Sequence, residues 1–516
     1  MSNKQIKFGN EARLKIKAGI DKAADAVRPT LGAVGMSAII EYKGLDPIEC
    51  DDGVTILKNL EFNDPYENLG LQKLRKAALR TSTEGGDGTA TTTVLTQALV
   101  EAAFKEISND SSKIREVRER LDAGLKEVLI ELSKLKRDVT EDDIERIATI
   151  SSLDPEVAKV IAEVIKEVGI NGVITVEKGA QLGYSKEVVK GARFDKGWIS
   201  HFFINTPESQ SVVLNEPYIV LVDRVIASNE QIMSILNSIG TGKDVLFIAD
   251  NVQSIALATL TLNAQNRVLN VACVQNPYSA SRGRDFLLDM AALTGATVIS
   301  EEKGMKLDNA TVELCGRAEK VVVTRDNTTI IGGKASDALQ ARIKSIEDEI
   351  ASTTSEYQKL VLEERLAQLT GGIGVIRVGA YTDTEFNAKK YKFDNAVNAT
   401  QAALQEGILP GGGMALALLS GIISEQMFKK ALQTPFRQMA VNAGLEAAEA
   451  WHKLMPNPVG WGYDFTTKTL VNMFDAGIID PFKVVRLALE SATAIAKSLV
   501  SIETAIVNEE EEKVKV

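Results

Sequence analysis

The sequence contains few of the residues on which much enzyme chemistry depends. Its 516 residues include only 2 histidines, His201 and His452, and 3 cysteines, Cys50, Cys273 and Cys315. The cysteines lie far apart without a CxxC spacing, so they indicate neither a zinc site nor a disulfide framework, and they fit a reducing cytoplasm. The two histidines nearly exclude histidine-based catalysis and multi-histidine metal sites. Carboxylates must therefore do whatever chemistry the protein performs.

A basic surface and a membrane-spanning run are also missing. Lys and Arg number 59 against 70 Asp and Glu, and the net charge of −11 argues against nucleic acid or an anionic membrane as a main partner. The longest weakly polar run, GGGMALALLSGII at 411–423, is too short to cross a bilayer. The amino-terminal residues lack the apolar centre of a secretory signal. We therefore expect a cytoplasmic protein with no nucleic-acid or membrane partner.

The hydrophobic pattern changes along the chain. From about residue 10 to 133, apolar residues recur at three- and four-residue spacing, which predicts a layer of helices. Between about 190 and 370, short β-rich runs such as YIVLVD and DVLFIAD alternate with helices, so we expect an inserted α/β domain. Residues 338–372 have heptad-like spacing broken by STTSE, which predicts a helical hairpin, and helices dominate again after it.

One glycine-rich segment combines a carboxylate with hydroxyl groups. Residues 83–95 read TEGGDGTATTTVL, in which Asp87 stands among glycines and is followed by threonines and a helical pattern. Unpaired N–H groups at a helix start favour an anion, so a phosphate could bind here while Asp87 holds a metal ion. The alternative is a glycine-rich turn in which Asp87 or Thr89 only caps the helix, and a single motif of this kind favours that alternative.

Further tight turns make a nucleotide pocket the better interpretation. TLGAVG at 30–35, CDDGVTIL at 50–57 and ILPGGGMALAL at 408–418 each bring glycine or acidic residues to a turn beside a helix. No GxxxxGK[ST] motif is present, so this is not a P-loop site. We expect magnesium to be held by Asp87, with Asp52 and Asp480 as further candidates.

At this point the motifs carry a resemblance to a known family. TLGAVG, DDGVTILKNLEFNDPYENLG, GGDGTATTTVL, GVITVEKG, LTGATVIS, GRAEKVVVTRDNTTIIGG, EGILPGGGMALALL and DAGIIDPFKVVRLALESA occur in this order over nearly the whole chain. The sequence resembles the group I chaperonins, the GroEL family, as a divergent member. The GDGT and PGGG motifs together are highly specific.

The resemblance implies a multi-domain subunit with three domains. These are a mainly α-helical equatorial domain at 1–133 and 406–516, a small α/β intermediate domain at 134–189 and 374–405, and an inserted α/β apical domain at 190–373. It also implies heptameric rings that bind unfolded or partly folded proteins, and it allows a co-chaperonin. The implied cofactors are ATP and Mg²⁺, with K⁺ as an option.

The resemblance also transfers site residues position by position. Asp52 and Asn395 take the catalytic positions, and Asp87 takes that of the magnesium ligand. The nucleotide positions fall on Thr30, Leu31, Gly32, Asp51, Asp87, Gly88, Thr89, Ala90, Thr91, Gly412, Asp464, Phe465 and Asp480.

Several of these positions depart from the family pattern. Ala33 replaces a usual proline, Asp51 a lysine and Ala90 a pocket threonine. In KFDNAVNATQAALQEG the family has two successive acidic residues, and the second, which acts on the attacking water, is here Asn395. Asp394 points about 100° away from it on a helix and cannot simply take over. An amide cannot act as a base at neutral pH but can orient water, so we expect slow hydrolysis.

The inserted domain contains the expected substrate surface. WISHFF at 198–203 presents aromatic residues, NEQIMSILNSIG has an apolar stripe that omits Met233, and QSIALATLTLNAQ is apolar on nearly every face. The residues alone favour a last helix buried on both sides. The resemblance instead implies an apolar groove, with Thr261 polar where the family has valine. The candidate groove residues are Trp198, Phe202, Phe203, Met233, Leu236, Leu257 and Leu262.

We therefore expect an ATP-dependent chaperonin with slow ATPase activity. The alternative from another class is a holdase ring that binds ATP and unfolded chains but scarcely hydrolyses, which Asn395 favours. A metabolic kinase with glycine-rich loops is a third possibility, but the sequence has no recognisable acceptor site.

Overall fold

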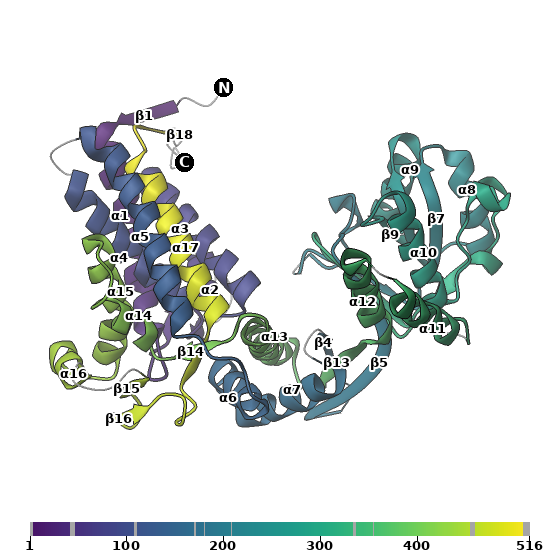
Figure 1. The fold of residues 1–516 in the computed structure, drawn as a ribbon. Coiled ribbons are helices and arrows are strands. Elements are labelled where there is room, and N and C mark those ends of the chain that lie inside the picture. Colours follow the sequence, from purple (N-terminus) through teal and green to yellow (C-terminus); the bar gives the residue numbers. More distant parts are fainter. Residues whose placement is uncertain are drawn as a thin grey trace. The chain divides into compact units, whose positions relative to one another are not determined.

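The computed structural model describes residues 4–41, 47–107, 111–169, 172–179, 181–207, 209–333, 337–353, 355–454 and 460–508. The chain divides into two compact units, shown in Figure 1. Unit 1 combines Met1–Ala162 with Tyr381–Val516, and unit 2 is Glu163–Ala380. The chain therefore leaves unit 1, forms unit 2 and returns.

Unit 1 is a bundle of long helices. The apolar side chains of α1 recur at Ile16, Ile20, Ala23 and Val27 and are all buried, which is the spacing of one helix face. Helix α17 packs against α3, α4 and α5. The helices of this unit are α1 (Gly9–Val27), η1 (Arg28–Thr30), α2 (Gly53–Asn59), α3 (Pro65–Gly85), α4 (Thr89–Ile107), η2 (Ser111–Lys113), α5 (Ile114–Lys134), α6 (Glu141–Ser152), α13 (Asp383–Glu406), α14 (Met414–Leu419), α15 (Gln426–Asn442), α16 (Ala447–Leu454) and α17 (Phe482–Val500), while α7 (Pro155–Val168) contains the unit boundary.

Small antiparallel sheets tie together segments of unit 1 that are distant in sequence. Strand β1 (Lys4–Phe8) pairs with β18 (Thr504–Asn508), so both ends of the described chain meet. The buried Arg13 secures this junction, since its guanidinium donates to the Ile502 carbonyl and the Glu503 carboxylate, each at 2.8 Å. The other pairs are β2 (Ala38–Ile40) with β3 (Ile48–Cys50), β14 (Ile408–Pro410) with β17 (Ile479–Pro481), and β15 (Trp461–Asp464) with β16 (Thr469–Asn472).

Unit 2 contains two sheets. In the first, of order β10-β7-β8-β9, the central strands are parallel and are connected through α8 and α9, as βαβ units require. The second is mixed, of order β4-β13-β5-β12-β11-β6. The strands are β4 (Val173–Lys178), β5 (Tyr184–Phe194), β6 (Val212–Asn215), β7 (Tyr218–Ile226), β8 (Asp244–Val252), β9 (Asn270–Gln275), β10 (Gly316–Arg317), β11 (Lys320–Val323), β12 (Thr328–Ile331) and β13 (Gly372–Val378).

The helices of unit 2 cover the parallel sheet and form the predicted hairpin. Helices α11 and α12 contact each other, which confirms the hairpin expected at 338–372. The buried Asp289 of α10 accepts hydrogen bonds from the guanidinium groups of Arg342 of α11, at 2.7 Å, and Arg365 of α12, at 2.8 Å. These ion pairs attach the hairpin to α10. The helices are α8 (Asn229–Ile239), α9 (Ser254–Gln265), α10 (Ala280–Thr294), α11 (Asp337–Ser352), α12 (Glu356–Thr370), η3 (His201–Phe203), η4 (Glu301–Lys303), η5 (Leu307–Asn309) and η6 (Val312–Leu314).

These observations confirm the expected fold class of a mainly helical part that receives an α/β insertion. The finer division into five domain segments stays a prediction.

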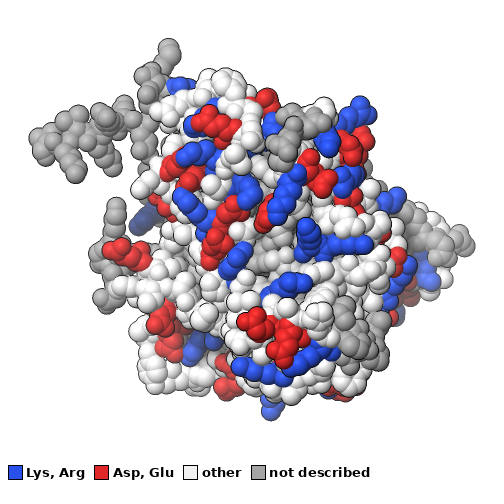
Figure 2. Space-filling view, turned by 90° about the vertical axis from the view of Figure 1, so that its left-hand side faces the viewer, with Lys and Arg blue, Asp and Glu red and all other residues white. Residues whose placement is uncertain are grey.

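On the face drawn in Figure 2, Lys and Arg side chains lie among Asp and Glu side chains and form no separate patch. No described helix combines the length and apolar composition that crossing a bilayer requires.

Helices α1 and α3 approach so closely that their contact requires glycine. A Cβ atom added to Gly70 would lie 2.0 Å from the Ile16 carbonyl oxygen, and one on Gly19 would lie 1.9 Å from that of Glu67. Both obstacles are backbone atoms, which cannot rotate away as a flexible side chain can. A larger residue at either position must push the two helices apart.

We expect Gly70→Ala to destabilise unit 1 by about 3 kcal/mol or more, at or above the upper end of ordinary overpacking. Thermal melts followed by far-ultraviolet circular dichroism would measure the effect. Gly421→Ala is the matched control, because its Cβ atom would meet only the Leu418 carbonyl oxygen at 3.6 Å. A Gly70→Ala protein that melts together with the control would contradict the close packing.

Candidate functional site

The segment between α3 and α4 forms a tight loop at the start of a long helix. Gly86 caps α3 with a φ of 82° and Gly88 has a φ of 91°, a region that side chains disfavour. The Gly88 N–H group donates to Asp87 Oδ1 at 2.6 Å, and α4 begins at the next residue. The loop therefore presents backbone N–H groups and one carboxylate at the positive end of a helix dipole.

Some of the threonines that follow have hydroxyls that bond within the protein, and another is accessible to a ligand. Thr92 and Thr93 are fully buried, where the Thr92 hydroxyl donates to Thr81 at 3.0 Å and the Thr93 hydroxyl to the Thr89 carbonyl at 2.8 Å. Thr91 is partly exposed. Of these hydroxyls, that of Thr91 is the best placed to meet a ligand.

Asp87, Asp52 and Asp480 meet around this loop. Burial raises the pKa of Asp87 above its usual value and the charge of Asp52 adds to this, while the Gly88 N–H group opposes it. Burial raises the pKa of Asp480 most, and the charge of Asp87 raises it further, to about 7. A hydrogen bond from the Gly413 N–H group acts in the opposite direction and lowers it. Although protein atoms crowd around Asp87, the residue keeps solvent-exposed surface through which an ion can reach it. Asp87 thus feels the charge of Asp52, and Asp480 feels that of Asp87, and a cation beside Asp87 would relieve this repulsion.

Asp52 is held by donors on several sides. As the N-cap of α2, it accepts from the Val54 N–H group at 3.1 Å and the Thr55 N–H group at 2.7 Å. The Thr55 hydroxyl donates to Oδ2 at 2.7 Å, and the hydroxyl of Tyr391 donates to Oδ1 at 2.9 Å. The adjacent Gly53 lies beside Thr89, because a Cβ atom on Gly53 would be 3.1 Å from Thr89 Cγ2. Asp52 therefore borders the loop with a fully engaged carboxylate.

Helix α13 brings Asn395 to the same place. A Cβ atom on Gly86 would lie 2.4 Å from the Ala399 nitrogen, so α13 packs directly on the loop. Tyr391 lies one turn before Asn395 on the same helix. Burial strongly raises the pKa of its phenol, with the charge of Asp52 next in effect. Asp394 instead pairs with Lys390 at 2.6 Å. Sequence reasoning missed Tyr391, for which no motif gives a signal.

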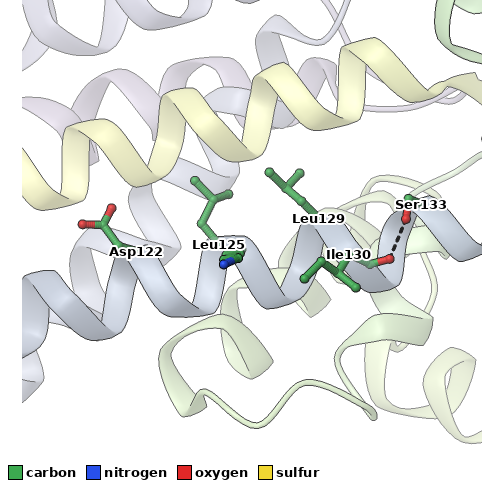
Figure 3. Close-up of a pocket in the computed structure, with 6 residues that line it drawn as sticks. Asp122, Leu125, Leu129, Ile130 and Ser133 are labelled. Atoms are coloured by element: carbon green, nitrogen blue, oxygen red, sulfur yellow. Dashed lines mark hydrogen bonds between the residues drawn. The ribbon is translucent and has the colours of Figure 1, made fainter.

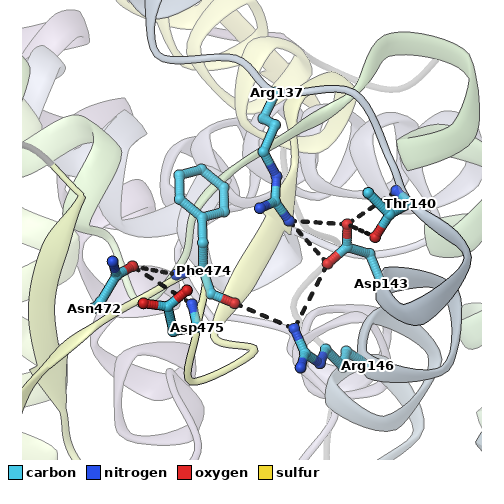
Figure 4. Close-up of polar contacts among 7 residues, drawn as sticks. All are labelled: Arg137, Thr140, Asp143, Arg146, Asn472, Phe474 and Asp475. Atoms are coloured by element: carbon cyan, nitrogen blue, oxygen red, sulfur yellow. Dashed lines mark hydrogen bonds and ion pairs between the residues drawn. The ribbon is translucent and has the colours of Figure 1, made fainter.

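A polar cluster fixes the segment that leads to Asp480 (Figure 4). Burial would raise the pKa of Asp143, but hydrogen bonds from Thr140 and the Arg137 charge hold it below its usual value. The Arg137 guanidinium donates to both Asp143 oxygens at 2.9 Å and lies 4.4 Å from the centre of the Phe474 ring. Arg146 donates to the Phe474 carbonyl at 3.3 Å. The cluster thus joins α6 to the loop before β17, which contains Asp480.

The remaining predicted nucleotide residues lie in two neighbouring turns. Gly32, with a φ of 93°, packs against Met439, and Gly412 has a φ of 61°. Leu31 and Phe465 belong to one buried cluster, which joins the two regions. Their side chains are core residues, so the nucleotide contacts predicted at these two positions fall to the backbone and stay a prediction.

Other polar residues in these turns have local roles. Asp464 accepts from the Thr466 N–H group at 2.8 Å and the Thr467 hydroxyl at 2.7 Å, so its carboxylate closes its own turn. The Thr30 hydroxyl donates to the Val27 carbonyl at 2.8 Å. Asp51 is exposed and Ala90 partly exposed.

A shallow hollow of about 370 Å³ lies elsewhere, along α5 (Figure 3). It is lined by Asp122, Leu125, Lys126, Leu129, Ile130 and Ser133. The Ser133 hydroxyl donates to the Ile130 carbonyl at 2.7 Å, and Asp122 pairs with Lys497. The hollow contains none of the predicted site residues and no glycine loop, so it is a poor phosphate site.

The structure corrects part of the predicted substrate groove in unit 2. Phe203 and Leu236 are 2% and 8% exposed and belong to the core, so they do not lie on an open surface. Phe202, Met233 and Leu262 are exposed, and Trp198 and Leu257 are partly exposed. Helix α9 contacts both η3 and α8, so these side chains lie on neighbouring elements.

One exposed residue of this region was missed. Ile255 of α9 is 62% exposed, whereas Ala256 and Leu260 of the same helix are buried. Helix α9 is thus apolar on an open face as well as on its core face, and the expectation of burial on both sides is wrong. Thr261 satisfies its hydroxyl within the helix, at 3.0 Å from the Leu257 carbonyl.

Comparisons with known proteins give a family and a shared fold. The model of the TCP-1/cpn60 chaperonin family matches residues 23–510. The chain is also similar to a solved structure, the chaperonin gp146 from the bacteriophage EL 2 (Pseudomonas aeruginosa), crystallised in the presence of ATP-BeFx. That likeness has a TM-score of 0.70 at 21% identity and covers 98% of this chain and 99% of the other. At this identity it shows a shared fold.

Proposed function

The chain belongs to the TCP-1/cpn60 chaperonin family, and from this premise we propose that it is an ATP-driven chaperonin with slow nucleotide hydrolysis. Chaperonin function follows from the family, and the nucleotide chemistry is our inference from the site. The observation that carries it is the meeting of Asp52, Asp87 and Asp480 at the glycine loop before α4.

The residues present fit magnesium and a nucleotide. The described residues contain no group of three His, Cys, Asp or Glu side chains that could hold a metal ion by themselves. Mg²⁺ commonly binds through one or two carboxylates, water and substrate phosphates, so Asp87 is sufficient when ATP completes the site. Bound there, Mg²⁺ would neutralise phosphate charge during transfer.

Each part of the site has a role in this proposal. The N–H groups of the loop and of the first turn of α4 bind phosphate oxygens, and Gly32 and Gly412 allow the backbone to approach the nucleotide. Asn395 orients the attacking water through its amide. The chaperonin of bacteriophage EL 2, which was crystallised with ATP-BeFx, supports a nucleotide as the ligand.

A holdase ring that hydrolyses ATP very slowly is the second candidate, and two features favour it. Asn395 cannot accept a proton at neutral pH. Both oxygens of Asp52 already accept hydrogen bonds, from Val54, Thr55 and Tyr391, so they are occupied by protein donors. The site therefore has positioned hydrogen-bonding groups but no free general base.

The apolar surface of unit 2 is the proposed site for non-native protein. Phe202, Met233, Ile255 and Leu262 expose large apolar side chains on neighbouring elements, and methionine adapts to varied partners. Assembly into heptameric rings, the use of a co-chaperonin and a cytoplasmic location remain part of the proposal through the family resemblance.

The nucleotide proposal predicts that Asp87→Asn loses magnesium-dependent ATP binding. The amide keeps the size of the side chain but removes the charge that holds the metal. Calorimetric titration of the assembled protein with ATP, with and without Mg²⁺, measures this. Asp394→Asn is the control, since that carboxylate pairs with Lys390. Equal affinities in the parent and Asp87→Asn would exclude Asp87 as the ligand.

Restoring a carboxylate should distinguish the folding machine from the holdase. We expect Asn395→Asp to raise the ATP turnover number at least about tenfold with little change in ATP affinity, because a positioned base typically contributes on the order of 10²- to 10⁴-fold. Asn387→Asp, at an exposed position of the same helix, is the control. A parent that already hydrolyses as fast as Asn395→Asp would refute the slow-hydrolysis proposal.

The substrate surface predicts that Met233→Ser combined with Leu262→Ser weakens capture of a denatured protein and leaves ATP binding unchanged. Each lost apolar side chain removes roughly 1.5 to 3 kcal/mol of burial where substrate covers it fully. Suppression of aggregation measures capture. Leu182→Ser is a matched control, because Leu182 and Leu262 are both 58% exposed. Unimpaired suppression by the double variant would remove this surface from the proposal.

A further inference from the structure

Helices α8 and α9 place a methionine and a leucine at the same level of the proposed substrate surface. The helices follow β7 and β8, which are parallel neighbours, so both helices run in the same direction. The Thr259 hydroxyl of α9 donates to Asn229 Oδ1 of α8 at 2.7 Å, which shows the helix faces that meet. Met233 and Leu262 lie about one turn further along these same faces, because residues three or four positions apart share a face of a helix.

Both side chains are open to solvent. Met233 is 43% exposed and Leu262 is 58% exposed, whereas Ile232 and Leu260, on the same two helices, are buried. Ile255 adds a further exposed aliphatic side chain on α9. A segment of non-native protein that binds across α8 and α9 would therefore cover the Met233 thioether together with aliphatic neighbours.

This exposure sets Met233 apart from most other methionines. Of the methionines in the part of the chain that the structure describes, Met36 of unit 1 is the other exposed one, and Met305 is partly exposed. The buried ones are Met290, Met414, Met427, Met439 and Met473. A closed core shields a thioether from solutes, so a dissolved oxidant reaches Met233 and Met36 first.

A dissolved peroxide is sufficient to convert this thioether. The sulfur attacks one peroxide oxygen, the O–O bond breaks, and after proton transfer the products are one sulfoxide and one water molecule. The sulfur is oxidised by two electrons, and hydrogen peroxide is reduced by the same two. The sulfoxide is polar and accepts hydrogen bonds from water, so the side chain loses its preference for an apolar partner.

The thiols of unit 2 are less suited to this reaction. A thiol reacts with peroxide as its thiolate, so it must be both accessible and easily ionised. Cys273 is fully buried, and burial raises its pKa far above the usual value. Burial also raises the pKa of Cys315, to about 11, against a smaller lowering by the Arg317 charge. A thioether needs no ionisation, so Met233 is the most accessible reactive sulfur among the described residues of unit 2.

We propose that Met233 is an oxidation-sensitive switch in the substrate surface: a peroxide converts its thioether into the sulfoxide, and the surface then binds non-native protein weakly until the sulfoxide is reduced. This inference rests on the proposed function of that surface and adds its regulation by oxidants. The switch lies on α8, at a distance in sequence from every residue of the candidate nucleotide site, so it acts on capture of substrate.

The test treats the full-length assembled protein with hydrogen peroxide, removes the peroxide, and then measures how well the protein suppresses aggregation of a denatured protein. Peptide mass spectrometry measures the sulfoxide at Met233 and Met36. We expect the parent to lose capture about fivefold and to recover it with the two methionine sulfoxide reductases, one for each sulfoxide epimer. Met233→Gln, which is polar without any oxidant, should show a loss of the same size before treatment.

Two conservative variants locate the effect. Met233→Leu keeps an apolar side chain of similar volume, so peroxide should lower its capture less than about 1.5-fold. Met36→Leu removes the other exposed methionine and should lose capture as the parent does. Thermal melts of all variants, with and without peroxide, should give the Tm of the parent.

Several results would overturn the proposal. These are an equal loss in Met233→Leu and the parent, undiminished capture by protein whose Met233 is oxidised, and a Met233 that stays reduced while Met36 is oxidised. An untreated parent that fails to suppress aggregation would instead refute the proposed function of this surface.

Discussion

The candidate site depends on how closely two helices approach one loop. Between α3 and α4, a side chain on Gly86 would meet the Ala399 nitrogen of α13 at 2.4 Å, and one on Gly88 would meet Val484 of α17 at 2.6 Å. The loop can adopt its positive φ angles and admit both helices only because it has no side chains there. Helix α13 contains Asn395, and α17 directly follows β17, which contains Asp480. The absence of side-chain bulk in the loop therefore decides which groups surround Asp87.

The same packing gathers like charges at a place where they are unfavourable without a partner. Asp52 and Asp87 interact, Asp87 and Asp480 interact, and the pKa of Asp480 reaches about 7. Ionising such a group costs free energy that the folded protein must recover elsewhere. Fixed structure holds the segments in place: the apolar core around α17, and the Arg137, Asp143 and Arg146 cluster that secures the segment before β17. A cation at the loop would relieve the remaining repulsion, which is how an arrangement unfavourable by itself can serve binding.

Much of this arrangement could be predicted from the sequence, and what was missed has physical reasons. The glycine loops, the inserted α/β part and the helical hairpin have local signals in residue type and spacing. Tyr391 has none, because its role arises from a contact with Asp52 across 339 positions of the chain. Phe202 and Phe203 are neighbours in η3, where successive side chains point about 120° apart, so one is exposed and the other buried. A run of aromatic residues does not reveal which of its members faces the core.

The amide at position 395 agrees with the electrostatics of the site. A carboxylate there would bring a further negative charge close to Tyr391, whose phenol already lies in the field of Asp52 and Asp87. The amide avoids that repulsion while keeping an oxygen that can accept a hydrogen from water. It thereby separates two properties that a carboxylate combines, because it can position water but cannot remove its proton. Under the proposed function, such a site would hold ATP longer before hydrolysis, and the lifetime of the bound nucleotide is the quantity in which the two proposed functions, a holdase and a folding machine, differ.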